Sequence, residues 1–336
     1  MAKNNFYKNK KILVTGGAGS IGSKIIKELL KYSPKVIRAL DNNETGLFDL
    51  EHELSSERLR LLIGDVRDKR RLIRAMEGVD IVFHAAALKH VPLCEYNPFE
   101  AVQTNVIGTQ NVIDACLDTE VERMINISTD KAVSPINVMG ATKLLTERLV
   151  SAACYYKGKR KTVFASVRFG NVLNSRGSIL PLFKKQIRDK GLVTVTDPEM
   201  TRFIMSFDRA VKLILEAAVK AKGGEVFILK MPVLRTGDLT EAIIEELAPK
   251  YGYKPEQIKI KLIGERTGEK LHEELMTEYE AKKAYETKNM FIIFPSIIRK
   301  KSTQKHLLKK SYSSKNETPL NKKEVKKLLK EILSLS

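Results

Sequence analysis

Cysteines and long apolar runs are scarce in this sequence. The three cysteines, Cys94, Cys116 and Cys154, form no CxxC pair, and a sparse, odd set does not make the disulfide framework of a secreted domain. No run of about 18 uncharged apolar residues occurs, so we expect no membrane span. The lysine-rich start MAKNNFYKNKK lacks the apolar core of a signal peptide. We therefore expect a cytoplasmic protein.

Positive charge is the unusual part of the composition. The 336 residues include 59 Lys or Arg and 40 Asp or Glu, a net charge of +19. With 43% hydrophobic residues the chain is not wholly disordered. Residues 296–336 hold twelve Lys or Arg against three Glu, so about half of the excess lies there. Charge-rich chain ends are more often solvated tails than specific sites.

Short β-branched runs alternate with helical patterns in the first half of the chain. Strands are predicted at residues 11–15, 36–40, 59–63, 80–85, 123–128 and 163–168, and helices at 21–30, 105–116 and 140–153. This alternation predicts an α/β fold with a doubly wound parallel sheet covered by helices on both faces.

The second half is more irregular, with short strands predicted at 192–195, 203–207 and 225–229. We expect a Rossmann-like nucleotide-binding domain over residues 1–170, to which some later segments return. A smaller, interleaved α/β substrate-binding region would span 171–295, and a terminal segment 296–336. Within the latter, residues 299–318 are expected to form a mobile lysine-rich loop. After it, Asn321 and Glu324 are expected to open an amphipathic helix that docks on the body.

A glycine-rich turn follows the first predicted strand. Gly16, Gly19 and Gly22 have GxxGxxG spacing, and the next helix begins near Ser20 and Ile21. Glycines let the backbone approach a pyrophosphate, and a helix N-terminus offers N–H donors to it. Between a strand and a helix, this pattern predicts a dinucleotide site more readily than a plain turn.

Acidic and small residues follow the next three strands. Asp41 ends the second strand, where a carboxylate accepts both ribose hydroxyls and repels a 2′-phosphate, so NAD is favoured over NADP. Asn42 and the pair Asp65–Val66 are expected near the adenosine. The small pair Ala85–Ala86 ends the fourth strand and lets its backbone lie against the cofactor. Asn105 completes the predicted cofactor set.

Two histidines and a cysteine lie close together in the sequence after the fourth strand. His84, His90 and Cys94 have some resemblance to a zinc site. No carboxylate or second cysteine completes a tetrahedral ligand set. We therefore expect no metal.

Polar residues gather after the fifth strand. Thr129, Asp130 and Lys131 end it, and Lys143 lies four residues after Met139, on the same helical face. A threonine at a strand end and a lysine on the facing helix can hold a sugar hydroxyl against a nicotinamide. Asp130 and Lys131 add an acid and a base. An ion-paired loop without function is the alternative.

These motifs, taken together, resemble one known family. The segments, in order over residues 11–276, are TGGAGSIG, HAAALKHVP, NVIGTQNV, STDKAVSPINVMGATK, RFGNVLNSRGSILPLF, TDPEMTRF and RTGEKLHEEL. They are similar to the extended short-chain dehydrogenase/reductases, specifically the UDP-N-acetylglucosamine 4,6-dehydratases of polysaccharide biosynthesis. The resemblance implies a short soluble member, NAD as cofactor, a UDP-sugar substrate and a homo-oligomer.

The resemblance also implies roles for individual residues. NAD would oxidise C4 of the sugar, water would leave across C5 and C6, and the hydride would return to C6. Lys131 would be the C5 base, Asp130 the acid at the C6 hydroxyl, Thr129 the anchor at O4, and Lys143 the partner of the nicotinamide ribose. The residues expected to hold the nucleotide sugar are Lys89, Asn171, Ile179, Leu180, Arg202, Arg266 and Glu269.

Met139 departs from the superfamily, which usually has tyrosine at this position. A thioether cannot move a proton. Methionine resembles the branch that retains the C5 configuration, so retention is expected. The alternatives are an inverting dehydratase, a UDP-sugar C4-epimerase and, more remotely, a non-catalytic dinucleotide- or nucleic-acid-binding protein. Because the lysine-rich tail lacks interleaved aromatic residues, no nucleic acid is expected as a partner.

Overall fold

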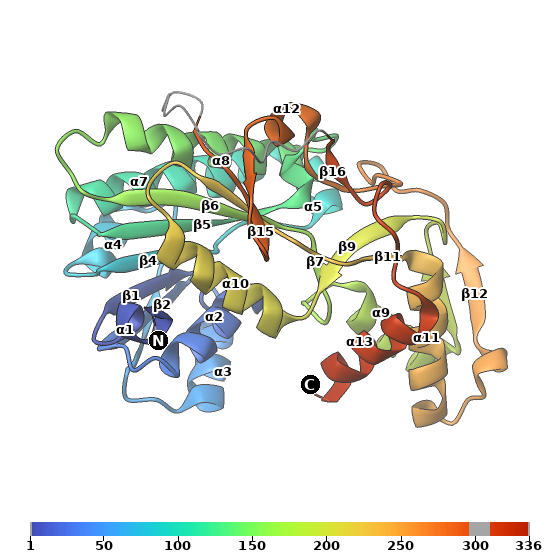
Figure 1. Ribbon diagram of the computed structural model, residues 1–336. Helices are drawn as coiled ribbons and strands as arrows, with labels where there is room; N and C mark the ends of the chain where they lie inside the picture. The colour runs from blue at the N-terminus through green and yellow to red at the C-terminus, as the bar shows by residue number, and fades with distance from the viewer. Residues whose placement is uncertain (1, 296–309, 335–336) are drawn as a thin grey trace.

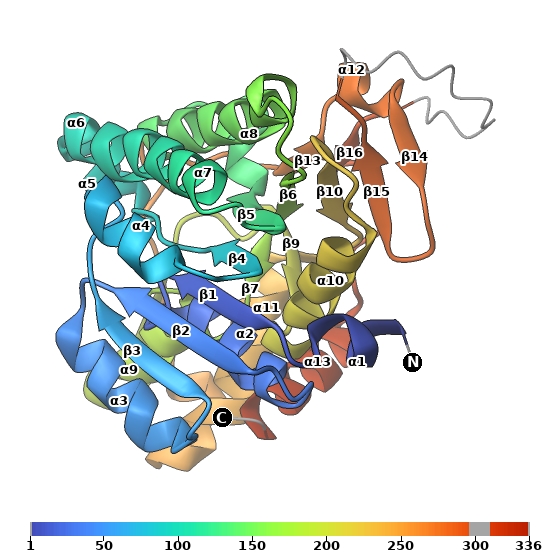
Figure 2. The ribbon, with the colours of Figure 1, turned by 90° about the vertical axis from the view of Figure 1, so that its left-hand side faces the viewer.

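The computed structural model describes residues 2–295 and 310–334. A large twisted sheet with helices on both faces forms most of the molecule, and a smaller region packs beside it (Figure 1 and Figure 2). The predicted α/β fold with a doubly wound sheet is confirmed. In this part of the chain, no helix is both long enough and apolar enough to cross a membrane.

The large sheet has nine strands within the described residues, in the order β3-β2-β1-β4-β5-β6-β10-β15-β14. Pairing is parallel from β3 to β10 and antiparallel between β10, β15 and β14. The strands are β1 (Lys11–Thr15), β2 (Val36–Asp41), β3 (Leu59–Ile63), β4 (Ile81–His84), β5 (Arg123–Thr129), β6 (Val163–Phe169), β10 (Val226–Leu229), β14 (Ala284–Glu286) and β15 (Met290–Ile293). The strand order reverses between β1 and β4, where ligands bind in open α/β sheets.

Alternating strand residues supply two cores, one on each face of the sheet. Ile12 and Val14 join a cluster under one set of helices, whereas Leu13 joins the cluster on the other face. The first set is α1 (Ala2–Tyr7), α2 (Ser20–Leu30), α3 (Glu44–Leu54) and α10 (Phe207–Lys220). The second set is α4 (Lys69–Met76), α7 (Gly108–Asp118) and α8 (Val138–Tyr156) (Figure 2). Between β4 and α7 lie α5 (Val91–Tyr96), α6 (Pro98–Ala101) and the π-helix η1 (Val102–Ile107), so the helix expected at 105–116 begins earlier and irregularly.

The smaller region has its own core. Strands β7 (Asn171–Val172), β9 (Thr201–Met205) and β11 (Val233–Arg235) form one sheet, and β8 (Leu192–Val195) pairs with β12 (Lys259–Leu262). Helices α9 (Ile179–Lys190), α11 (Thr236–Leu247) and α13 (Lys322–Ser334) pack together beside them (Figure 1). The docking predicted for the last helix is confirmed, since Val325, Leu329 and Ile332 are buried in this core.

Two predictions about chain segments need correction. The strand expected at 203–207 is β9, which ends at Met205 because Ser206 caps α10 by accepting from the backbone N–H of Arg209. The loop expected at 299–318 lies partly outside the described residues, but Tyr312–Ser313 forms strand β16 beside β13 (Glu274–Met276). Tyr312 is buried against Phe203 and Phe291. A single aromatic residue among lysines and serines gives too weak a periodic signal to predict this strand.

Candidate active site

The glycine turn lies against the end of β4. Gly16 has a φ of +67°, and a Cβ there would lie 2.6 Å from the backbone nitrogen of Ala86. A Cβ on Gly22 would collide with the carbonyl oxygen of Gly16. No described side chain caps the N-terminus of α2, so the N–H groups of its first turn are available to an anion. This is the cradle that a pyrophosphate requires.

A cavity of about 320 Å³ extends from this turn along the carboxyl ends of β1, β2 and β3. Its walls include the predicted cofactor residues Gly16, Gly19, Asp41, Asn42, Asp65, Val66, Ala85 and Ala86. Asp41 is fixed at the wall because its two carboxylate oxygens accept from the backbone N–H groups of Ala18 and Asn43, each at 3.0 Å. A glycine turn after the first strand and a carboxylate at the end of the second strand, both on the wall of one cavity, fit a dinucleotide such as NAD.

Replacing Gly16 with alanine is expected to remove dinucleotide binding, whereas Gly158→Ala leaves it unchanged. Both glycines have positive φ, +67° and +62°, so both substitutions introduce backbone strain. Only at Gly16 does a Cβ meet backbone atoms; nothing lies within 4 Å of the Cβ position of Gly158. NAD content of the purified variants, read by absorbance and mass spectrometry, checks this. Equal loss in both variants would contradict the cradle.

Asn105 lies behind the cofactor cavity, not on its wall. It is 1% exposed. Its amide donates to the carbonyl of Leu88 at 3.1 Å and to Thr142 Oγ1 at 2.9 Å, and its Oδ1 accepts from the Leu88 N–H at 2.8 Å. These bonds fix the segment after β4, so the structure gives Asn105 a positioning role. A direct contact with the cofactor stays a prediction.

His84 is a core residue. Its ring nitrogens lie 2.7 Å from Thr15 Oγ1 and 3.0 Å from Thr109 Oγ1. Burial, assisted by the charge of Lys143, lowers the pKa of His84 to about 3, so the ring is neutral. Among the described residues, no three His, Cys, Asp or Glu side chains are grouped to hold a metal.

The end of β5 brings three of the predicted catalytic residues together. Thr129 Oγ1 donates to Asp130 Oδ1 at 2.8 Å, and Lys131 Nζ lies 3.1 Å from the same oxygen. Asp130 is fully buried, and its Oδ2 has no hydrogen-bond partner in the described structure. A buried carboxylate oxygen without a donor is costly. This oxygen is therefore available to accept a hydrogen bond from a hydroxyl group of a ligand.

Lys143 and Met139 differ in their surroundings although they share α8. Lys143 Nζ donates to the carbonyl of Ile127 on β5 at 2.6 Å. Burial lowers the pKa of Lys143 to about 8, against the opposing attraction of Glu147. Met139 is 4% exposed and packs with Cys94 and Ala101. It is an apolar packing residue in this structure.

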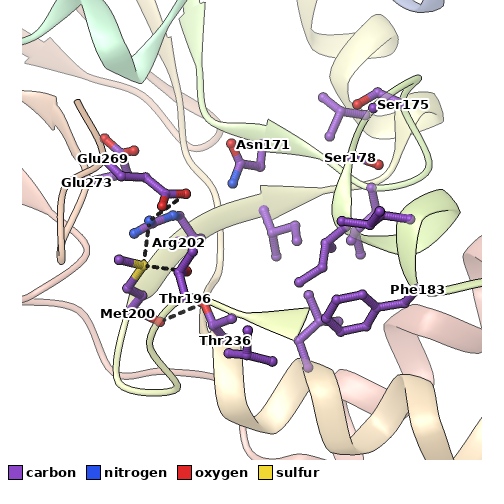
Figure 3. A pocket seen from close by; sticks show the side chains of 18 of the residues that line it. Asn171, Ser175, Ser178, Phe183, Thr196, Met200, Arg202, Thr236, Glu269 and Glu273 are labelled. Carbon is purple, nitrogen blue, oxygen red and sulfur yellow. Dashed lines mark hydrogen bonds and ion pairs between the residues drawn. The ribbon is translucent and has the colours of Figure 1, made fainter. Parts of the chain in front are cut away.

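A second cavity, of about 330 Å³, lies between β5 and the smaller region. Its walls include the predicted residues Lys89, Lys131, Asn171, Ile179, Arg202, Arg266 and Glu269. Figure 3 shows Arg202 and Glu269 on one side of it and Ser175, Ser178 and Phe183 on the other. The side chain of Leu180 is instead fully buried in the core of the smaller region, so a substrate contact by that side chain is not supported.

Arg176 and Glu273 line the cavities but are not among the residues predicted from the sequence. Arg176 lines both cavities, and its N–H donates to Ser20 Oγ at 3.1 Å, so it joins the glycine turn to the second cavity. Glu273 lines the second cavity and lies 3.1 Å from Lys131 Nζ. The sequence separates it from Lys131 by 142 residues. No local pattern could have joined them.

Comparison with known proteins places this site in a family. The model of the family described as "Polysaccharide biosynthesis protein" matches residues 12–295. The chain belongs to this family. The family comprises nucleotide-sugar dehydratases and epimerases of the extended short-chain dehydrogenase/reductase type, and the resemblance read from the sequence is confirmed.

Three relatives span most of the chain. An uncharacterized membrane protein of Methanocaldococcus jannaschii is 65% identical, over 98% of this chain and 97% of its own. A UDP-N-acetylglucosamine 4,6-dehydratase (inverting) of Campylobacter jejuni is 44% identical, over 87% and 84%. A UDP-glucose 4-epimerase of Rickettsia akari is 39% identical, over 96% of each chain.

Two solved structures have a fold similar to that of this chain. The X-ray structure of Pen from Bacillus thuringiensis is 46% identical, with a TM-score of 0.94 over 98% of this chain and 100% of that one. The dTDP-glucose 4,6-dehydratase DesIV from Streptomyces venezuelae, solved with NAD bound, is 24% identical, with a TM-score of 0.69 over 78% and 86%. At that identity the second likeness speaks for the Rossmann-like fold alone.

Proposed function

We propose that the protein is a UDP-N-acetylglucosamine 4,6-dehydratase that uses NAD and retains the configuration at C5. One observation carries this proposal. Lys131, which is ion-paired with Asp130, lines the second cavity, whose wall is rich in arginine and lysine. Arg176 lines both this cavity and the cavity beside the glycine turn. A nucleotide sugar in the second cavity would thus place its hexose beside an acid and a base. The dehydratase name of the Campylobacter jejuni relative supports this reaction type.

The chain's residues divide into cofactor and substrate roles. Gly16, Gly19 and Gly22 would hold the pyrophosphate of NAD, Asp41 the adenosine ribose and Lys143 the nicotinamide ribose. When bound, NAD supplies a hydride acceptor for C4 and a hydride donor for C6. Arg202, Arg266 and Glu269 would hold the diphosphate and ribose of UDP, and Asn171, Ile179 and Lys89 the sugar end. Because a diphosphate is anionic, it matches the arginines and lysines of this cavity.

Proton transfer belongs to the residues at the end of β5. Thr129 would anchor O4 of the sugar. Lys131 would take the proton from C5 once C4 is a ketone, and Asp130 would protonate the hydroxyl that leaves C6 as water. Met139 takes no part, since its side chain is packed among apolar residues. Its presence in place of tyrosine is what favours retention.

A single experiment tests reaction type and stereochemistry together. The protein is incubated with UDP-N-acetylglucosamine in deuterated water, and the product is examined by mass spectrometry and NMR. Loss of one water with deuterium at C5 in the original configuration supports the proposal. Loss of water with the inverted configuration at C5 would support the dehydratase reaction but contradict retention.

The second candidate is a UDP-sugar C4-epimerase. The Rickettsia akari relative carries that name over nearly the whole chain. An epimerase returns the hydride to C4 and releases no water. A product of unchanged mass with inverted C4 would therefore establish the epimerase instead of the dehydratase.

Replacing Asp41 with alanine is expected to weaken NAD binding and to reduce the preference for NAD over NADP. Hydrogen bonds to a charged group contribute about 1.5–3 kcal/mol, which corresponds to a roughly 10–100-fold higher Kd for NAD. NADP loses less because its 2′-phosphate is no longer repelled. Asp49→Ala on the exposed side of α3 serves as the control. Isothermal titration of both cofactors checks this, and an unchanged NAD:NADP ratio would contradict the assignment.

A further inference from the structure

Residues 173–178, which we call the bridging segment, connect β7 to α9. Asn174 and Gly177 both have left-handed backbone, with φ of +66° and +75°. A Cβ on Gly177 would lie 2.7 Å from Cε1 of His90, so glycine is required where the segment passes the residues that follow β4. The bridging segment is therefore packed closely against another part of the site.

The backbone of Arg176, within this segment, is bonded to both parts of the site. Its N–H donates to Ser20 Oγ at 3.1 Å, in the first turn of α2 beside the glycine turn. Its carbonyl accepts from Nζ of Lys89 at 2.7 Å, and Lys89 lines the second cavity. Burial, followed by the charge of Arg176, lowers the pKa of Lys89. These two bonds hold Arg176 at the boundary of the two cavities, and it lines both of them.

The guanidinium of Arg176 is left without a partner by these contacts. Within the described part of the chain it forms no ion pair and no hydrogen bond. The other arginine on the wall of the cofactor cavity, Arg67, is paired with Glu100 at 2.7 Å. Asp41 and Asp65 add negative charge to the same wall. Among the described residues of that wall, Arg176 is thus the arginine whose charge no carboxylate neutralises.

Two anions would lie beside this guanidinium in the proposed reaction. The pyrophosphate of NAD would occupy the glycine turn, and the diphosphate of the UDP-sugar would occupy the second cavity. Two bound anions repel each other, and a cation between them attracts both. A guanidinium suits this position because its several N–H donors can bond to more than one phosphate oxygen.

We propose that Arg176 couples the binding of the dinucleotide to that of the nucleotide sugar by bonding to a phosphate group of each. This inference rests on the proposed function. The proposed reaction takes a hydride from C4 and returns it to C6 of the same sugar, so neither ligand can leave between these steps. Coupling keeps both bound over this interval. By linkage, UDP tightens the binding of NAD by the same factor as NAD tightens that of UDP.

Isothermal titration with NAD, in the presence and absence of UDP, tests the coupling. In the wild type, saturating UDP should lower the Kd for NAD by about 5–50-fold, within the range found for coupled sites. Arg176→Gln keeps a polar side chain without the charge. In this variant UDP should leave the Kd for NAD unchanged or raise it, because the two anions then repel each other without a shared cation. Titration with UDP, with and without NAD, should give the same factor for each protein.

Two further variants separate the charge of Arg176 from its position. Arg188→Gln, on the exposed side of α9, is the matched control and should keep the wild-type factor. Arg176→Lys keeps the charge and should keep part of the coupling. Because Arg176 is exposed, the fold should be retained in both of its variants. An Arg176→Gln protein with the wild-type factor would overturn the proposal, even if its Kd for NAD alone is higher. So would a wild type in which UDP does not tighten NAD.

Turnover without added NAD gives a second readout. With UDP-N-acetylglucosamine, the wild type should release water at a steady rate, whereas Arg176→Gln should slow progressively as cofactor is lost, and added NAD should restore its rate. A slow variant that added NAD does not restore would contradict the coupling. If the wild type releases no water, the proposed function fails, and the titrations with NAD and UDP still decide whether Arg176 couples the two sites.

Discussion

Replacing Lys131 with arginine is expected to lower kcat by about 10²–10⁴-fold, the typical contribution of a general base. Arginine keeps a positive charge between Asp130 and Glu273, so the buried carboxylates remain paired and the fold is retained. A guanidinium does not lose its proton in a protein. The C5 proton then has no acceptor. Rates of water loss from UDP-N-acetylglucosamine, measured with bound-NAD content and the melting temperature, check this result.

Two further variants separate the base role from charge pairing. Lys131→Ala should lose as much activity as the arginine variant, but it also leaves two buried carboxylates facing each other and should unfold at a lower temperature. Lys185→Arg, on the exposed side of α9, controls for the exchange itself. Near-normal turnover by Lys131→Arg would exclude Lys131 as the base. Asp130→Asn should lose activity to a similar extent, since an amide cannot protonate the leaving hydroxyl.

The sequence predicts the parts of the site that are contiguous in the chain. The glycine turn, Asp41 and the Thr129–Lys131 motif all lie at the carboxyl ends of strands, and a parallel sheet brings these ends to one edge. Their convergence therefore needs only the strand order. The bonds of Glu273 to Lys131 and Ser314 join positions 142 and 41 residues apart. They depend on how the smaller region folds back, which periodicity does not encode.

The sequence does not determine whether the side chain of Leu180 faces the cavity or the core. It lies in the first turn of α9, next to Ile179, and both are apolar. Neighbouring helix residues point in directions about 100° apart, so at most one of the two faces a given wall. The structure puts Ile179 on the cavity and Leu180 in the core with Phe183. Which of the two side chains faces the cavity depends on how α9 packs against its neighbours. The family motif contains both residues and does not distinguish them.

Arg168 lies at the centre of a buried ion cluster that connects the site to the rest of the molecule. Its Nε donates to Glu147 Oε1 at 3.0 Å and its Nη1 to Glu280 Oε2 at 2.9 Å, and Nη1 also donates to the Leu275 carbonyl. Burial opposes its charge, but Glu147 and Glu280 outweigh this and raise the pKa of Arg168. The cluster joins β6 and α8 to β13 and to α12 (Glu278–Ala281). Glu273 immediately precedes β13, so its position depends on this junction.

Replacing Arg168 with methionine is expected to lower the free energy of unfolding by about 3–5 kcal/mol, because two buried carboxylates lose their shared cation. The melting temperature should fall by roughly 4–7 °C for a chain of this length. Arg74→Met, on an exposed position of α4, should change neither quantity. Urea unfolding and thermal denaturation at pH 7 measure both effects.

The triple variant Glu147→Leu/Arg168→Met/Glu280→Leu distinguishes an unpaired charge from lost packing. Replacing all three charges removes the desolvation cost together with the attraction, so most of the stability should return. Part of the loss should remain, because Glu280 also accepts from the backbone N–H of Thr277 and caps α12. If the triple variant is no more stable than Arg168→Met, the loss comes from packing around the guanidinium. In that case the ion cluster is not the interaction that holds β13 and α12 against β6 and α8.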